Sequence, residues 1–182
     1  GQSDGDLAGT VYQHTVTNLS GTFAHSTVLS ASSNSFNITG NLTVPAGKTF
    51  QIESGKTLNF VNYYKLRVEG TLNASSATLQ GSGYPGSWYG IEFYNATSGQ
   101  DLSYSTIKDA SYGLNFINSD VTFSRPTMRD NTYGMNCTNY SDPVFISSVF
   151  QTNGFGVYGD ANSHPYLGAY IGYNSFRTND YY

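Results

Sequence analysis

The string "YGLNF" at residues 112–116 returns as "YGMNC" at residues 133–137, and "YGIEF" already stands at residues 89–93. A fourth version, "FGVYG", begins at residue 155. The aromatic residues that open the later copies stand at positions 112, 133, 155 and 181, which gives steps of 21, 22 and 26 residues. This interval is shorter than the roughly 33 residues of helical-pair repeats, so the pattern indicates a repeat built from short strands.

The alignment of these copies extends backwards from the "YG" pair. "STIKDASYG" (105–113) aligns with "PTMRDNTYG" (126–134), "SVFQTNGFG" (148–156) and "NSFRTNDYY" (174–182). Apolar and aromatic residues recur in the same columns, and they alternate with polar residues at the period of a β-strand. We therefore expect three core ladders, made of Ile107, Met128, Phe150 and Phe176; of Tyr112, Tyr133, Phe155 and Tyr181; and of Ile91, Leu114, Met135 and Val157.

The N-terminal half repeats with a compatible step. "GNLTV", "GKTFQI", "GKTLNF" and "YKLRV" place pairs of apolar residues eight positions apart, so three strands make a coil of 24 residues. Gly47 and Gly55 serve the turns, and Asn95, Asn118 and Asn139 are expected at corners because Asn tolerates the left-handed backbone. The sequence predicts an all-β fold, a single-stranded right-handed parallel β-helix (solenoid). Each coil would hold 21–26 residues and three short strands, stacked about 4.8 Å apart.

The organisation along the chain follows from these repeats. Residues 1–35 are less regular and are expected to form N-terminal strands that cap the solenoid, whereas residues 36–182 form one continuous domain of coils. The last copy, "NSFRTNDYY", stops where the others continue into Gly and an aliphatic residue, so we expect an uncapped C-terminal end. An uncapped end has three interpretations: the chain is a fragment of a longer β-helix, a neighbouring loop folds back over the end, or another subunit supplies the next coil. The third would give a head-to-tail oligomer or filament.

Composition excludes several classes of function. Charged residues make up 11% of the chain and the net charge is −4, which argues against a nucleic-acid partner. No apolar run reaches the roughly 20 residues of a membrane-spanning helix, so we expect no membrane insertion. Cys137 is the only cysteine, His14, His25 and His164 lack ligand spacing, and no cofactor or metal site is expected. The two "GKT" strings lack the preceding glycine of a phosphate-binding loop.

The later coils resemble right-handed parallel β-helix proteins of the pectate-lyase-like superfamily, in their secreted or cell-surface form. The residues that carry the resemblance are "WYGIEF" (88–93), "LSYSTIKDASYGL" (102–114) and "DPVFISSVFQTNGFGV" (142–157), and it covers about residues 36–182. It implies a β-helix fold and a secreted or cell-surface location, with the signal peptide removed. It does not imply one activity, because the same coils serve enzymes, adhesins and surface coats.

One cluster of charges follows the repeat. Lys108 and Asp109 align with Arg129 and Asp130, so two carboxylates would lie one coil apart. Such a pair either shares a proton or a cation, as in an enzyme or metal site, or belongs to a solvated ladder of ion pairs. The second interpretation is favoured, because each carboxylate has a neighbouring cation. The Asn-Thr-Asp, Gly-His-Gly and Arg-x-Lys motifs of polygalacturonase-like enzymes are absent.

These observations favour a non-catalytic extracellular structural or adhesive protein of a cell surface or fibre. The alternative is a polysaccharide-binding or polysaccharide-degrading module, in which Lys108, Asp109, Arg129 and Asp130 would act. The 16 tyrosines also suggest glycan contacts, since exposed aromatic rings stack on sugars, although they equally cover the edges of a core. Seven Asn-x-Ser/Thr sequons are expected glycosylation sites if the chain is exported, namely Asn18, Asn37, Asn41, Asn73, Asn95, Asn136 and Asn139.

Overall fold

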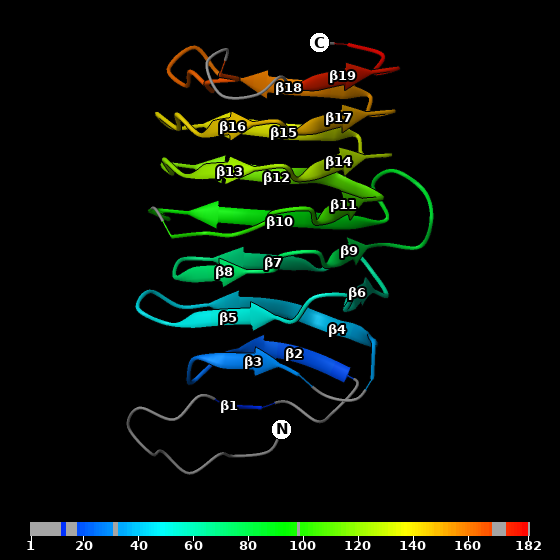
Figure 1. Ribbon diagram of the computed structural model, residues 1–182, viewed down its shortest axis with the longest axis vertical. Coiled ribbons are helices and arrows are strands. Elements are labelled where there is room, and N and C mark those ends of the chain that lie inside the picture. The colour runs from blue at the N-terminus through cyan, green and yellow to red at the C-terminus, as the bar shows by residue number, and fades with distance from the viewer. Residues whose placement is uncertain (1–11, 14–17, 31–32, 98, 169–173, 182) are drawn as a thin grey trace.

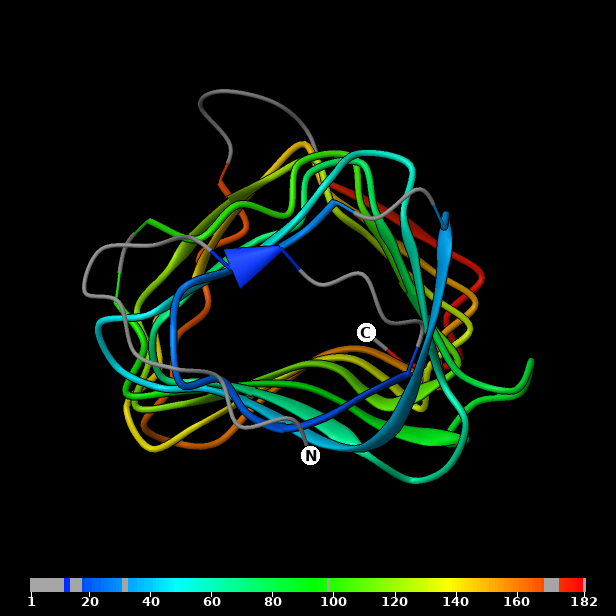
Figure 2. The ribbon, with the colours of Figure 1, turned by 90° about the horizontal axis from the view of Figure 1, so that it is seen from below.

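The computed structural model describes residues 12–13, 18–30, 33–97, 99–168 and 174–181. In these residues the chain is all-β, contains no helix and stacks parallel strands into a solenoid of about seven turns (Figure 1). Seen along the stack, the coils superpose around one interior (Figure 2). The predicted all-β parallel β-helix is confirmed. Within the described residues, no helix is long and apolar enough to cross a membrane.

Three faces of parallel strands, here called A, B and C, wrap the interior, and β4 joins the strands of faces A and B into one 13-stranded sheet. Face A contains the first half of β4 (Ser35–Val44), β6 (Thr57–Phe60), β9 (Thr78–Gln80), β11 (Thr106–Lys108), β14 (Thr127–Arg129), β17 (Val149–Gln151) and β19 (Ser175–Arg177). Face B contains β2 (Asn18–Thr22), the second half of β4, β7 (Lys65–Val68), β10 (Trp88–Tyr94), β12 (Ala110–Ile117), β15 (Tyr133–Thr138) and β18 (Phe155–Gly159). Face C contains β1 (Tyr12–Gln13), β3 (Thr27–Leu29), β5 (Thr49–Ile52), β8 (Thr71–Asn73), β13 (Thr122–Ser124) and β16 (Val144–Ile146).

The strand register places the aligned apolar residues above one another. Ile107 pairs with Met128, Met128 with Phe150, and Phe150 with Phe176. The first three are completely buried and Phe176 packs against the core. The aliphatic column behaves alike, since Ile91, Leu114 and Met135 are completely buried and Val157 packs against them. These two columns form the continuous apolar interior between faces A and B.

The corners of the coils contain residues in the left-handed conformation. Gly47 and Gly55 have φ values of 74° and 79°. Asn95, Asn118 and Asn139 have φ values of 50°, 50° and 56°, as expected for the Asn corner. The Asn118 amide donates a hydrogen bond to Asn95 Oδ1 at 2.8 Å, so the side chains of this corner also join adjacent coils.

The column that contains Tyr112 differs from the expected core ladder. Tyr112 and Gly113 lie inside β12, whereas the corner before this strand is formed by Asp109, which has φ 68°. Tyr112 is partly exposed while Leu114, two residues later, is completely buried. The in-out alternation is therefore broken at the glycine, and the expected core ladder of Tyr112, Tyr133, Phe155 and Tyr181 lies on the outer surface instead.

Residues of the expected N-terminal segment also stack on the coils. β2 pairs in parallel with β4, and β3 pairs in parallel with β5. Their inward side chains, including Leu19 and Leu29, belong to the same core cluster as the later coils. Residues 1–11 and 14–17, with His14 among them, lie outside the described residues.

Candidate functional site

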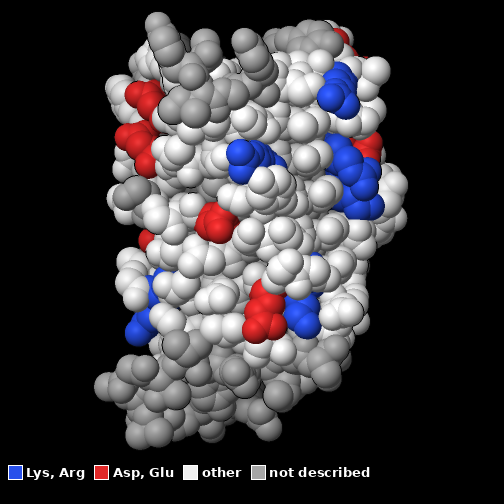
Figure 3. Space-filling view, in the orientation of Figure 1, with Lys and Arg blue, Asp and Glu red and all other residues white. Residues whose placement is uncertain are grey.

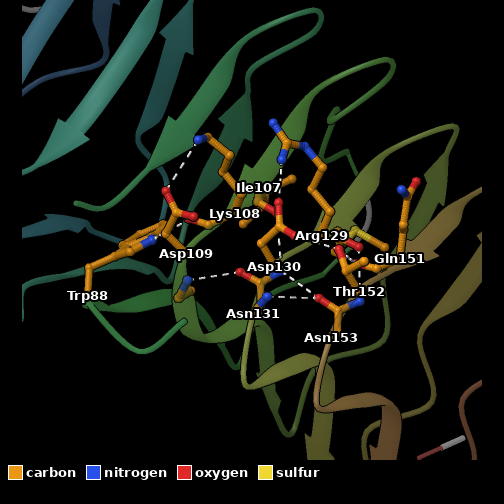
Figure 4. A network of polar contacts seen from close by, with 12 residues as sticks. Trp88, Ile107, Lys108, Asp109, Arg129, Asp130, Asn131, Gln151, Thr152 and Asn153 are labelled. Atoms are coloured by element: carbon orange, nitrogen blue, oxygen red, sulfur yellow. Dashed lines mark hydrogen bonds and ion pairs between the residues drawn. The ribbon is translucent and has the colours of Figure 1, made fainter. Parts of the chain in front are cut away.

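The four charged residues singled out by the alignment meet at the corner between faces A and B (Figure 4). Lys108 ends β11 and Arg129 ends β14, and the two are register partners on adjacent coils. Asp109 and Asp130 follow them directly, with φ values of 68° and 56°. The local sequence therefore turns each coil sharply at its carboxylate and brings the four charged residues together.

Each carboxylate of this corner is compensated by neighbouring groups. The Lys108 ammonium lies 3.3 Å from Asp109 Oδ2, and the Arg129 guanidinium is paired with Asp130 Oδ2. The Thr152 hydroxyl donates to Asp130 Oδ1 at 2.5 Å. Asp109 Oδ2 is buried and accepts no hydrogen bond from the described residues, so the adjacent ammonium charge is its compensation.

This geometry is an ion-pair ladder in which Asp109 is buried and Asp130 is 35% exposed. A general acid or base must reach the proton that it transfers, but the Asp109 side chain is only 4% exposed. The expectation that the ladder is solvated is therefore wrong at Asp109, because the corner and Lys108 cover it. No group of three or more His, Cys, Asp or Glu residues in the described part of the chain could hold a metal ion.

An amide ladder, which the sequence reasoning missed, lies just inside this corner. Asn131, Asn153 and Asn179 are 0%, 1% and 7% exposed. The Asn131 amide donates to Asn153 Oδ1 at 3.0 Å, and the Asn153 amide donates to Asn179 Oδ1 at 3.0 Å. The same oxygens accept backbone N–H groups of the preceding coil. The signal was present in the alignment, where Asn follows the Asp or Thr column in three successive coils.

A second internal ladder uses serine hydroxyls at the corner between faces B and C. Ser119, Ser141 and Ser163 are at most 5% exposed. The Ser119 N–H donates to Ser141 Oγ and the Ser141 N–H donates to Ser163 Oγ, both at 3.1 Å. Buried polar side chains thus bind one coil to the next at two corners.

The outer surface of face B carries a continuous column of aromatic rings, here called the tyrosine ladder. Its members are Tyr63, Tyr89, Tyr112, Tyr133, Phe155 and Tyr181. Successive ring centroids are 6.0, 5.4, 5.2, 4.7 and 4.9 Å apart. From Tyr112 upwards the rings are nearly parallel, with interplanar angles of 21°, 9° and 22°. Most ring faces are therefore covered by neighbouring rings, and each such pair is worth about 0.5–1.5 kcal/mol.

This packing restricts how the aromatic residues could contact sugars. Trp88 is completely buried, stacks on Phe60 at 3.9 Å between ring centroids, and donates from Nε1 to the Lys108 carbonyl at 2.8 Å. It is therefore unavailable to a ligand. Large exposed tyrosines remain at positions 63, 84, 104, 140, 158, 166 and 181.

A buried carboxylate stands beside the lower part of the tyrosine ladder. Glu92 points outward from face B, yet its side chain is 4% exposed. Lys65 and Arg67 bind its Oε1 at 2.9 and 2.7 Å, and the Tyr89 hydroxyl donates to Oε2 at 3.1 Å. Burial by itself raises the pKa of Glu92, but the hydrogen bond and charge of Lys65, with the bonds from Tyr89 and Arg67, outweigh it and hold the pKa below its ordinary value. Burial and the Glu92 charge raise the pKa of Tyr89.

Face A presents a column of side-chain N–H donors. Its members, in register on successive coils, are Asn59, Gln80, Lys108, Arg129, Gln151 and Arg177. Basic side chains gather on the side of the molecule formed by β11, β14 and β19 (Figure 3). Arg177 is the most exposed cation of the column, whereas Lys108 and Arg129 are ion-paired with carboxylates.

The sequons are distributed over the outer surface. Asn18, Asn37, Asn41, Asn95 and Asn139 are exposed, and Asn73 and Asn136 are partly buried. The Asn136 amide donates to Asn115 Oδ1 at 2.6 Å, which ties this sequon into face B. The single thiol, Cys137, is completely buried, and burial raises its pKa.

Comparison of the chain with models of protein families, with curated proteins and with solved structures finds no match in any of the three.

Proposed function

We propose that the chain is a non-catalytic structural or adhesive module of a cell surface or extracellular fibre. The observation that supports this most strongly is that the charged groups of the corner compensate one another in place. Asp109 is buried against Lys108, and Asp130 is held by Arg129 and Thr152. The buried amide and serine ladders favour the same role, since they stiffen a rod that displays side chains at the spacing of its coils.

The same proposal includes export and membership of the pectate-lyase-like superfamily. Its support is the parallel solenoid itself together with the coil motifs of residues 88–157. In a host that exports and glycosylates the chain, we expect glycans at the exposed sequons. Mass spectrometry of the protein from such a host measures it, and a chain carrying no glycan at the exposed sequons contradicts it.

The absence of catalysis is tested directly with the corner carboxylates. We expect the wild-type protein to release no unsaturated or reducing ends from a panel of neutral and acidic polysaccharides. The double variant Asp109→Asn, Asp130→Asn should behave identically. Product release by the wild type that disappears in the double variant would overturn the structural role.

The partner that this role favours is a second copy of the chain. Each coil of a solenoid contacts only the coils next to it, so the end coil of one rod can stack on the end coil of another. A heterologous contact of this kind extends a rod without closing it. Negative-stain electron microscopy over a concentration series should show rods of constant width whose length increases with concentration. A single short particle length at every concentration would contradict assembly.

Glycan binding is the second candidate, and the donor column of face A favours it. Three of the six members are cationic and the other three are Asn or Gln amides. Both kinds of N–H donor suit carboxylate and hydroxyl acceptors. In affinity electrophoresis with a uronate polysaccharide, the wild type should be retarded and Arg177→Gln less so. Lys48→Gln, a change of equal charge outside this column, serves as the control. Equal retardation of the two variants would exclude face A.

A further inference from the structure

We infer that the tyrosine ladder contains a site of oxidative cross-linking, at which Tyr112 and Tyr133 are joined covalently between adjacent coils. The inference concerns a modification and does not depend on the proposed structural role. The Tyr112 and Tyr133 centroids are 5.2 Å apart at an interplanar angle of 21°, and the two residues are register partners of β12 and β15.

The pair is singled out by its neighbours in the ladder. Phe155 stacks on Tyr133 at 4.7 Å but has no hydroxyl, so it cannot form a phenoxyl radical. Tyr158 meets Tyr133 edge-on, with ring centroids 5.9 Å apart at an interplanar angle of 72°. On the other side, Tyr89 lies 5.4 Å from Tyr112 at 55°, and its hydroxyl is held by Glu92 and Asn115. Among the rings of the described residues, only the central pair combines two phenols with parallel stacking.

Solvent access and small flanking residues are also present at this pair. Both rings are partly exposed on the outer surface of face B. The residues that precede and follow them are small: Ser111 and Gly113 flank Tyr112, whereas Thr132 and Gly134 flank Tyr133. Because adjacent strands are about 4.8 Å apart, rotation about the two side-chain torsions brings the ring carbons next to the hydroxyls toward each other.

The reaction requires a one-electron oxidant of the haem-peroxidase type with hydrogen peroxide. Each phenol loses one electron and one proton, and the two radicals form a carbon–carbon bond between the positions ortho to their oxygens. The ring hydrogens at those carbons then move to the oxygens and restore both phenols. The pair has lost two hydrogens in total, and one peroxide has become two waters.

The test treats the full chain at low concentration with a haem peroxidase and hydrogen peroxide. Tryptic digestion isolates Tyr112 as the only tyrosine of the peptide 109–129, because the bond between Arg125 and Pro126 resists trypsin. We expect dityrosine fluorescence in a chain of unchanged size. We also expect the peptide 109–129 to be joined to 130–177 with the loss of two hydrogens.

Two variants decide whether the ladder geometry directs the reaction. Tyr133→Phe keeps the ring stack, as Phe155 already does, and should lose the link to peptide 109–129. Tyr140→Phe removes a tyrosine that is 70% exposed and outside the ladder, and the link should persist. Circular dichroism checks that both variants are folded. Dityrosine found only between chains, or an internal link that survives Tyr133→Phe, would overturn the inference.

Discussion

The buried amide ladder predicts a large loss of stability on replacing its central rung, Asn153→Ala. The Asn153 side chain donates to the Met128 carbonyl and to Asn179 Oδ1, and its oxygen accepts from the backbone N–H and the amide of Asn131. The Asn131 amide keeps a bond to the Ile107 carbonyl, and Asn179 Oδ1 keeps one from the Asn153 N–H. The Asn131 N–H and the Met128 carbonyl lose the partner that the side chain provided.

The size of the effect follows from these two groups. Leaving a buried donor or acceptor unsatisfied costs about 1–3 kcal/mol, so we expect the free energy of unfolding to fall by about 4 kcal/mol. That is a large fraction of the roughly 5–15 kcal/mol that stabilises a typical domain. The matched control is Asn118→Gly at the exposed corner. Glycine accepts the φ of 50° there, and only a solvent-exposed bond to Asn95 is lost, so the change should stay near 0.5 kcal/mol.

Equilibrium unfolding in urea, followed by circular dichroism and by the fluorescence of the single buried Trp88, measures both changes. Coincident curves from the two probes show that the solenoid unfolds as one unit, as the comparison requires. If Asn153→Ala costs no more than Asn118→Gly, the amide ladder does not stabilise the stack and the reasoning is refuted.

A second substitution separates hydrogen bonding from packing at the same position. Asn153→Asp preserves shape but can place a carboxylate oxygen where the amide donated to two oxygens at 3.0 Å. Burial raises the pKa of such a carboxyl in the folded state. Relative to the wild type, the stability of the variant should therefore be greatest at low pH, where the protonated group is again a donor, and should fall as pH rises above about 4. A variant whose stability follows the pH dependence of the wild type would contradict this.

Further predictions concern the backbone, the buried carboxylate and the thiol. Gly90→Ala should lower the free energy of unfolding by about 3 kcal/mol or more, since its Cβ would lie 1.6 Å from the Tyr112 carbonyl oxygen. In the control Gly83→Ala the Cβ meets open space, so the cost should be about 1 kcal/mol. The midpoints of urea unfolding compare the two variants. Because the folded-state pKa of Glu92 is lowered, its contribution is present above pH of about 4.3 and is lost as pH falls through the folded value. Glu92→Gln should therefore be less stable than the wild type at pH 7 and should show a flatter acid limb in thermal melts; an unchanged limb would contradict this. Cys137 should resist alkylation until urea unfolds the chain, and rapid labelling of the native protein would disprove its burial.

Much of the fold could be predicted from spacing alone. In a stack of equal coils, the residues one period apart become neighbours, so the columns containing Ile107 and Leu114 could be placed in the core from the alignment. The Asn corner was predictable for the same reason, since its members recur in step and tolerate positive φ.

The direction of individual side chains was harder to predict. Strict alternation places Tyr112 and Leu114 on one side of the strand, but the break at Gly113 turns the aromatic column outward. In the sequence, Asn153 looks like another polar surface residue. The partners that satisfy its buried amide come from the coils above and below, so they do not stand next to it in the sequence. Glu92 was missed similarly, since Lys65 and Arg67 reach it from a different coil.

The stacking of like on like has a consequence for how the chain folds. Residues paired between adjacent coils, such as Tyr112 and Tyr133, are separated by about one coil along the chain. A separation of about 22 residues in a chain of 182 gives a ratio near 0.12, below the roughly 0.16–0.22 of typical all-β sandwiches and barrels. Only two residues, Arg125 and Pro126, connect β13 to β14, so a coil cannot skip its neighbour and dock on the next. Each completed coil thus offers its successor a template within reach, and folding can spread from one rung to the next at a speed unusual for a parallel sheet.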